Sequence, residues 1–96
     1  AHTRGKYFCA HNWQGGLVTI ANAHLMAAVP NRFLLESNMT PNPFKEGLFK
    51  ERLAVENGYL DIPDKPGLGV EMREGLAEEY PYIPGPWNLP DPGMPK

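Results

Sequence analysis

The stretch that decides the fold is KYFCAHNWQGGLVTIANAHLMAAVPNRFLLE, residues 6–36. It contains a short apolar run at residues 7–10, a long apolar segment at residues 17–29 and a second short run at residues 33–35. Neither short run alternates apolar with polar residues, which is typical of strands covered on both faces, as in parallel sheets. Because parallel strands need a crossover of about a dozen residues or more, usually a helix, the stretch predicts a strand–helix–strand (βαβ) unit.

The segment at residues 17–29 is predicted to be a largely buried helix, because its apolar residues recur at helical spacing. Gly15 and Gly16 precede it, and Pro30 and Asn31 follow it as stop signals.

Two ionisable residues mark the ends of the predicted strands. His11 follows the first strand, and Glu36 ends the second. In barrels and open sheets built from such units the active site lies at the carboxyl ends of the strands, so we expect His11 and Glu36 to share one rim as a catalytic acid/base pair. The alternative for His11 is a rim histidine with satisfied hydrogen bonds and no catalytic role.

The loops after the two strands would face the same rim. The first loop, residues 11–16, is polar with a large aromatic residue, a composition suited to lining a pocket, so Asn12 and Trp13 are candidate substrate contacts. Trp13 has an alternative role as a hydrophobic lid over the rim. The second loop, residues 37–44, carries two prolines and two asparagines and is expected to lack regular structure.

The other histidines and the single cysteine are expected to be structural. His24 lies inside the apolar helix, where we expect it to be packed, and His2 lies near the start of the chain, where we expect it to be exposed. Cys9 lies within a predicted buried strand, without a basic neighbour to activate its thiol, and is expected to be a core residue. The three histidines have none of the usual metal-ligand spacings.

Composition limits the class of protein. Nine Lys and Arg against 11 Asp and Glu give a formal charge of −2, which argues against a nucleic-acid surface. One cysteine cannot form an internal disulfide, and no apolar run reaches the roughly 18 residues of a membrane span, so no membrane partner and a cytoplasmic location are expected. Because a two-stranded unit is marginal alone, we expect residues 1–96 to pack against further polypeptide.

The rest of the chain predicts short elements joined by rigid connectors. In order, these are a helix end capped by Gly5 at residues 1–5, an amphipathic segment at residues 48–55, a brief strand at residues 58–62, a proline- and glycine-rich connector at residues 63–71, a short helix at residues 72–80, and an extended, proline-rich tail at residues 81–96.

Five motifs stand out together: AHNW at residues 10–13, the helix LVTIANAHLMAAVPN, FLLE at residues 33–36, the loop NPF and, most specific, GYLDIPDKPGLGVE at residues 58–71. In combination they resemble the carboxyl-terminal end of the mandelate racemase subgroup of the enolase superfamily. The resemblance implies an α/β fold, the last βαβ unit of a modified TIM barrel in residues 1–57. Residues 58–96 would then return to pack on an α+β capping domain.

The resemblance also implies an enzyme that removes the proton next to a carboxylate, giving an enediolate held by Mg²⁺. By this likeness His11 matches a general base or acid. Glu36 matches a carboxyl group that hydrogen-bonds the substrate carboxylate, for which its pKa should be raised. The Mg²⁺ ligands are expected upstream, outside this chain.

Within this family, the polar loops favour an acid-sugar dehydratase, a lyase acting on a sugar-acid carboxylate. The resemblance also implies a homo-oligomer. A racemase, an epimerase or a lactone cycloisomerase is the alternative. A second alternative is a non-catalytic structural or interaction segment, with the proline-rich tail recognised by a partner.

Overall fold

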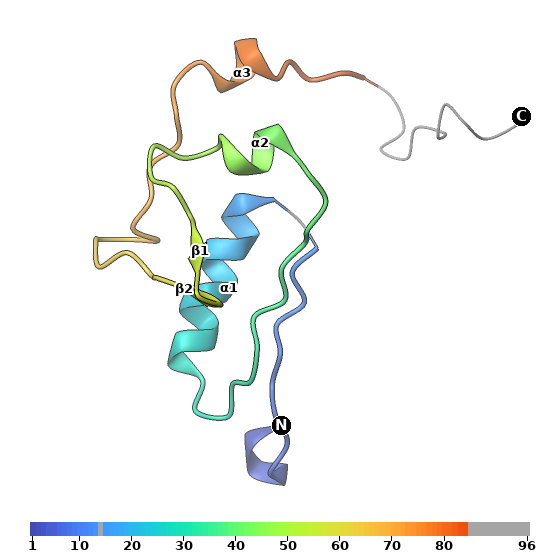
Figure 1. Ribbon diagram of the computed structural model, residues 1–96, viewed down its shortest axis with the longest axis vertical. Coiled ribbons are helices and arrows are strands. Elements are labelled where there is room, and N and C mark those ends of the chain that lie inside the picture. Colours follow the sequence, from blue (N-terminus) through green and yellow to red (C-terminus); the bar gives the residue numbers. More distant parts are fainter. Residues whose placement is uncertain (14, 85–96) are drawn as a thin grey trace, which may run out of the picture.

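The computed structural model describes residues 1–13 and 15–84, and its central element is the helix α1, Gly16–Ala28 (Figure 1). Gly15 precedes the helix in extended backbone, and the chain leaves it at Val29 just before Pro30, so the predicted helix and its stop signals are confirmed. Its buried residues recur every three or four positions, at Gly16, Ile20, Ala23 and Met26. Only one face of α1 is therefore buried, because the described chain packs against that face alone. The prediction of a largely buried helix is correct for that face only.

The two segments that flank α1 run side by side in the same direction (Figure 1). A single parallel bridge joins Phe8 to Arg32. The Phe8 N–H donates to the carbonyl oxygen of Asn31 at 3.0 Å, and the Phe33 N–H donates to that of Phe8 at 3.0 Å. The expected parallel pairing is therefore present, but as one bridge between extended segments and not as two regular strands.

The outer face of these segments is exposed, contrary to the prediction that both strands are covered. Tyr7 is 75% exposed, and Phe33 and Leu34 are each 61% exposed. Cys9 is exposed as well, so its assignment to the core is wrong for the described chain. The apolar runs were predicted to be strands and are extended segments joined by one bridge, and nothing within residues 1–13 and 15–84 covers this face.

Short elements make up the rest of the fold. They are the 3₁₀ helix η1 (His2–Arg4), the helix α2 (Pro43–Glu46), the strands β1 (Val55–Glu56) and β2 (Tyr59–Leu60), and the helix α3 (Leu76–Glu79). Gly5 follows η1 with φ of 61°, as the cap prediction required. β1 and β2 pair antiparallel across Asn57 and Gly58, whose φ values of 52° and 81° suit a tight hairpin turn.

Helix α2 corrects the expectation that residues 37–44 lack regular structure. Asn42 caps it, because its side-chain oxygen accepts a hydrogen bond from the Lys45 N–H at 3.2 Å. Pro43 occupies the first turn, where its missing N–H costs nothing. The Asn-Pro pair that was read as a turn signal is here a helix start.

The core lies between α1 and the second half of the chain. Its buried members are Ile20, Ala23, Leu48 and Phe49, and partly buried apolar side chains pack against them: Leu35, Leu53, Leu60, Ile62, Leu68, Val70 and Leu76. Residues 60–76 thus contact the same core as α1. The division at residue 57 and the docking of residues 58–96 on a capping domain stay predictions, and most of the tail, residues 85–96, lies outside the described residues.

No helix in the described part of the chain is both long and apolar enough to cross a membrane.

Candidate active site

His11 and Glu36 meet where the two extended segments end. The His11 Nδ1 atom lies 2.7 Å from Oε2 of Glu36, although 25 residues separate them in the sequence. Both side chains are reachable from solvent, with exposed fractions of 77% for His11 and 47% for Glu36. The crossover through α1 is what brings an imidazole and a carboxylate to one edge.

Glu36 is held in its ionised form. Its Oε2 atom accepts a hydrogen bond from the Asn12 backbone N–H at 2.5 Å as well as the contact with His11. The Asn12 N–H is the main cause that keeps the pKa of Glu36 below its ordinary value; it outweighs partial desolvation, and the His11 ring acts in the same direction. This corrects the expectation of a raised pKa, because that expectation foresaw no backbone donor aimed at the carboxylate.

The ionised carboxylate also fixes the tautomer of His11. A carboxylate only accepts hydrogen bonds, so Nδ1 of His11 carries the proton that it donates to Glu36. In the neutral ring, Nε2 is then left with its lone pair and can accept a proton.

Asn12 is the most enclosed polar residue of this region, with 1% of its surface exposed. Its side-chain Nδ2 donates to the backbone oxygen of Glu36 at 2.8 Å and to Thr19 Oγ1 at 3.1 Å. Asn12 therefore links the ends of both extended segments to the first turns of α1.

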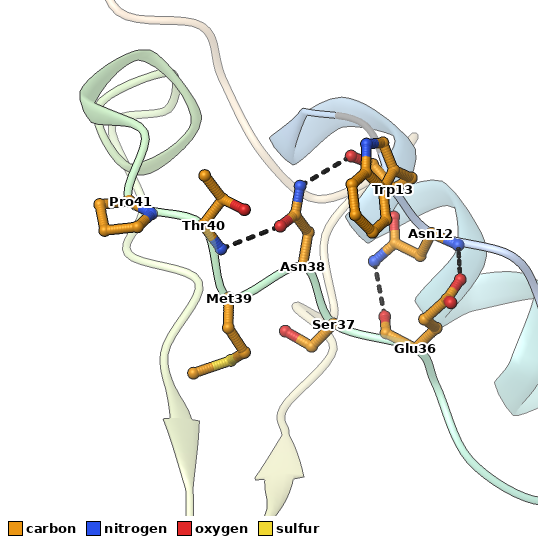
Figure 2. Close-up of a pocket in the computed structure, with 8 residues that line it drawn as sticks. All are labelled: Asn12, Trp13, Glu36, Ser37, Asn38, Met39, Thr40 and Pro41. Carbon is orange, nitrogen blue, oxygen red and sulfur yellow. Dashed lines mark hydrogen bonds between the residues drawn. The ribbon is translucent and has the colours of Figure 1, made fainter. Parts of the chain in front are cut away.

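Two open pockets adjoin Glu36. The loop pocket is formed by Asn12, Trp13 and residues 36–41, with a volume of about 450 Å³ (Figure 2). The strand pocket is formed by residues 9–11 and 34–36, with a volume of about 460 Å³. Glu36 lines both pockets, and His11 lines the strand pocket.

Asn38 holds the two loops of the loop pocket together, a role that the sequence did not suggest. Its Nδ2 donates to the backbone oxygen of Trp13 at 2.9 Å, and its Oδ1 accepts from the Thr40 N–H at 2.9 Å (Figure 2). Lys45 Nζ donates to the backbone oxygen of Asn38 at 2.5 Å. The pattern Asn-x-Thr at residues 38–40 could have indicated this turn, because an Asn side chain often accepts a hydrogen bond from the backbone N–H two residues later.

One wall of the loop pocket is therefore held by the hydrogen bonds of Asn38, and the exposed ring of Trp13 lies on another side. Trp13 is 66% exposed and lies at the pocket. Both roles considered for it, a pocket wall and a lid, stay open.

The remaining histidines lie away from this edge, as expected. His24 is half-buried, and its Nε2 atom lies 3.1 Å from the backbone oxygen of Leu68. His2 is exposed in η1.

The imidazole–carboxylate pair lies at the ends of two parallel segments joined by a helix, which is the place where active sites are found in barrels and open sheets. The comparison with family models makes this specific: the chain belongs to the enolase C-terminal domain-like family, whose model matches residues 1–76.

Curated relatives agree with this membership. The chain is 38% identical over 80 residues to arabinonate dehydratase of Saccharolobus solfataricus, covering 83% of this chain and 21% of the relative. It is 31% identical over 100 aligned residues to D-galactarolactone cycloisomerase of Agrobacterium fabrum, covering 96% of this chain and 25% of the relative. It is 37% identical over 70 residues to D-xylonate dehydratase of Haloferax volcanii, covering 73% of this chain and 17% of the relative. The chain thus spans a quarter or less of the length of these relatives, and no solved structure matches it.

The family is typically Mg²⁺-dependent, but the residues described here do not form a site for that ion. Residues 1–13 and 15–84 contain no group of three or more His, Cys, Asp or Glu side chains that could hold a metal. Mg²⁺ prefers several oxygen ligands in octahedral geometry. Glu36 is the one carboxylate that lines either pocket in the described chain, and its Oε2 is engaged by Asn12 and His11.

Proposed function

We propose that this chain supplies the His11–Glu36 edge of an acid-sugar dehydratase, a lyase that removes water from a polyhydroxylated carboxylate. The observation that carries the proposal is the 2.7 Å contact between His11 Nδ1 and Glu36 Oε2 at the mouth of a pocket. Relatives named arabinonate and D-xylonate dehydratase support the substrate class. The mostly apolar lining of the loop pocket includes the hydroxyl-bearing residues Ser37 and Thr40, which suit contacts with a substrate rich in hydroxyl groups.

In the proposed reaction the α-carbon loses a proton and the β-carbon loses its hydroxyl group. His11, in its protonated form, gives the Nε2 proton to the departing hydroxyl, which leaves as water. The α-proton goes to a base supplied from outside residues 1–96. The resulting enol rearranges to a 2-keto acid, so the overall change is loss of one water molecule.

In this scheme Glu36 acts on His11. Because the Asn12 N–H holds its pKa below the ordinary value, Glu36 is anionic near neutral pH. The same negative charge stabilises the positive charge that His11 carries before it gives up its proton. General acid/base groups of this kind typically contribute about 10² to 10⁴ in rate.

The test is turnover of sugar acids by the intact protein with Mg²⁺ present. Arabinonate, xylonate and galactonate, each deuterated at the α-carbon, are incubated with the protein and followed by NMR. The proposal predicts a 2-keto-3-deoxy product from at least one of them, with the α-deuterium lost. Recovery of starting material that has exchanged deuterium for solvent hydrogen, without a keto product, would instead identify a racemase or epimerase.

A lactone cycloisomerase is the second candidate. It is favoured by the likeness to D-galactarolactone cycloisomerase, whose alignment covers 96% of this chain. Incubation with a galactarolactone distinguishes the two, because a cycloisomerase gives an isomer of unchanged mass and a dehydratase gives no reaction. Because the mass is the same in both cases, NMR of the reaction mixture decides between these results through the appearance, or not, of signals that differ from those of the lactone.

A further inference from the structure

Of the two predicted substrate contacts, Trp13 is the one whose side chain is available to a ligand. The amide of Asn12 is buried and already donates to the backbone oxygen of Glu36 and to Thr19 Oγ1, so a ligand could reach it only by breaking a buried hydrogen bond. The side chain of Trp13 is instead mostly exposed and lines the loop pocket. A ligand in this pocket would therefore contact the indole ring and not the Asn12 amide.

The main chain at Trp13 is held on both sides. The residue before it, Asn12, is buried, and the Trp13 carbonyl oxygen accepts a hydrogen bond from Asn38 Nδ2 at 2.9 Å (Figure 2). Asn38 is itself fixed, because the Thr40 N–H donates to its Oδ1 and Lys45 Nζ donates to its backbone oxygen. A lid must swing its main chain to open, and these bonds oppose such a swing. The geometry therefore favours a fixed wall over a lid.

The loop pocket combines an apolar surface with hydroxyl groups. The apolar part comes from Trp13, Met39 and Pro41, and the hydroxyl groups come from Ser37 and Thr40. A sugar acid presents the same combination, because each hydroxyl-bearing carbon of its chain also carries hydrogen. The C–H groups can pack on the electron-rich face of an aromatic ring while the hydroxyl groups bond to polar side chains.

The two pockets divide a substrate between them. Glu36 lines both pockets, whereas His11 lines the strand pocket. In the proposed reaction the α- and β-carbons lie within reach of His11 Nε2. The loop pocket, on the Trp13 side of Glu36, is then left for the carbons beyond the reacting pair.

We propose that Trp13 is a specificity-determining residue: its fixed indole ring packs against the C–H groups of the substrate carbons beyond the reacting pair, and so selects sugar acids long enough to reach it. The inference rests on the proposed function for the identity of the reacting carbons, but not for the binding of a sugar acid beside the indole ring.

The test compares Trp13→Ala with Tyr59→Ala in the intact protein, using whichever of arabinonate, xylonate and galactonate is turned over fastest. We expect Trp13→Ala to raise KM about 5- to 10-fold with kcat within about threefold, since contacts with an aromatic ring have effects of this size on binding. Trp13→Phe keeps an aromatic ring and should restore most of the affinity. Tyr59 is also mostly exposed but lines neither pocket, so Tyr59→Ala should leave KM within about twofold.

A shortened acid tests the length selection. Glycerate has the α-hydrogen and the β-hydroxyl group but no carbon beyond them, so it serves as a short competitor. Its inhibition constant should change less than about threefold in Trp13→Ala, although the KM of the longer acid rises. An equal loss of affinity for both acids, a loss in kcat alone, or unchanged kinetics would overturn the inference.

Labelling with 5-fluorotryptophan gives a readout that does not need turnover. The ¹⁹F signal of Trp13 is the one that Trp13→Phe lacks, and we expect it to shift when arabinonate, xylonate or galactonate is added but not when glycerate is added. If none of the three longer acids shifts this signal, the inference is overturned. Should the signal shift while no sugar acid is turned over, the proposed function fails and the role of Trp13 in binding stands.

The same signal tests whether the wall is fixed. Asn38→Ala removes the hydrogen bond to the Trp13 carbonyl oxygen, so we expect it to broaden the Trp13 signal. Asn31→Ala is the matched control, because it removes an amide that also joins the two extended segments, through the Lys6 backbone oxygen, and it should leave the signal unchanged. A Trp13 signal that stays sharp in Asn38→Ala contradicts a wall held by Asn38.

Discussion

Two glycines of the GYLDIPDKPGLGVE motif allow a close packing contact to be tested by matched substitutions. Gly67 and Gly69 have nearly equal φ values, +70° and +72°, so an alanine at either position meets the same unfavourable backbone conformation. Their surroundings differ. A Cβ atom at Gly67 would have no neighbour within 4 Å, whereas at Gly69 it would lie 2.7 Å from Pro63 Cβ and 2.9 Å from the Pro63 backbone oxygen.

The expected costs follow from these distances. Gly67→Ala should lower the free energy of unfolding by about 1–2 kcal/mol, the cost of the left-handed conformation for a residue with a Cβ. Gly69→Ala bears the same backbone cost and must also push Pro63 aside, so about 1–3 kcal/mol is added for overpacking. The neighbouring Leu68 packs on the core and accepts a hydrogen bond from His24, so a shift here disturbs the contact with α1.

Urea denaturation of both variants, followed by circular dichroism, measures the difference. With a slope of about 1–3 kcal/mol per molar urea, the midpoint of Gly69→Ala should lie roughly 1 M below that of Gly67→Ala. Equal midpoints would refute the close approach of Gly69 to Pro63.

Three further changes test the core, an ion pair and the site. Ile20→Ala, at a position with no exposed surface, should lower the free energy of unfolding by about 2–5 kcal/mol, as measured by the same denaturation. Two groups lower the pKa of Glu51 from 4.5 to about 2: the backbone N–H of Glu71 has the larger effect, and the ammonium group of Lys65 adds to it. The ionised Glu51 therefore stabilises the fold above pH 4.5, and this contribution is lost as the pH falls toward 2. Glu51→Gln should therefore flatten the pH dependence of the thermal midpoint between those values, and an unaltered dependence would count against the pairing. Glu36→Gln should lower kcat about 10- to 100-fold, because a neutral amide cannot stabilise the charge of His11; a gain in kcat would show that a neutral group is what the reaction needs.

Local signals were enough to predict part of the fold. The spacing of apolar residues gave α1, and the Pro30-Asn31 stop together with the Gly5 cap fell where backbone sterics require them. Helix α2 was missed because Pro43 was weighed only as a breaker, although after Asn42 it also suits the first turn of a helix.

Features that depend on distant parts of the chain could not be predicted in the same way. The apolar run around Cys9 indicates an extended segment but not whether other residues cover it. The meeting of His11 with Glu36 could be expected from the topology of a crossover, whereas the lowered pKa of Glu36 arises from the Asn12 N–H, whose direction no sequence pattern shows.

The most direct test of the proposed function is the rate of 2-keto acid formation by His11→Asn beside His24→Asn. Both changes replace an imidazole by an amide, but His24 packs against Leu68, away from the two pockets. We predict that His11→Asn lowers kcat about 10²- to 10⁴-fold and that His24→Asn keeps it within about threefold. Full turnover by His11→Asn would contradict the assignment of His11 as the acid of this reaction.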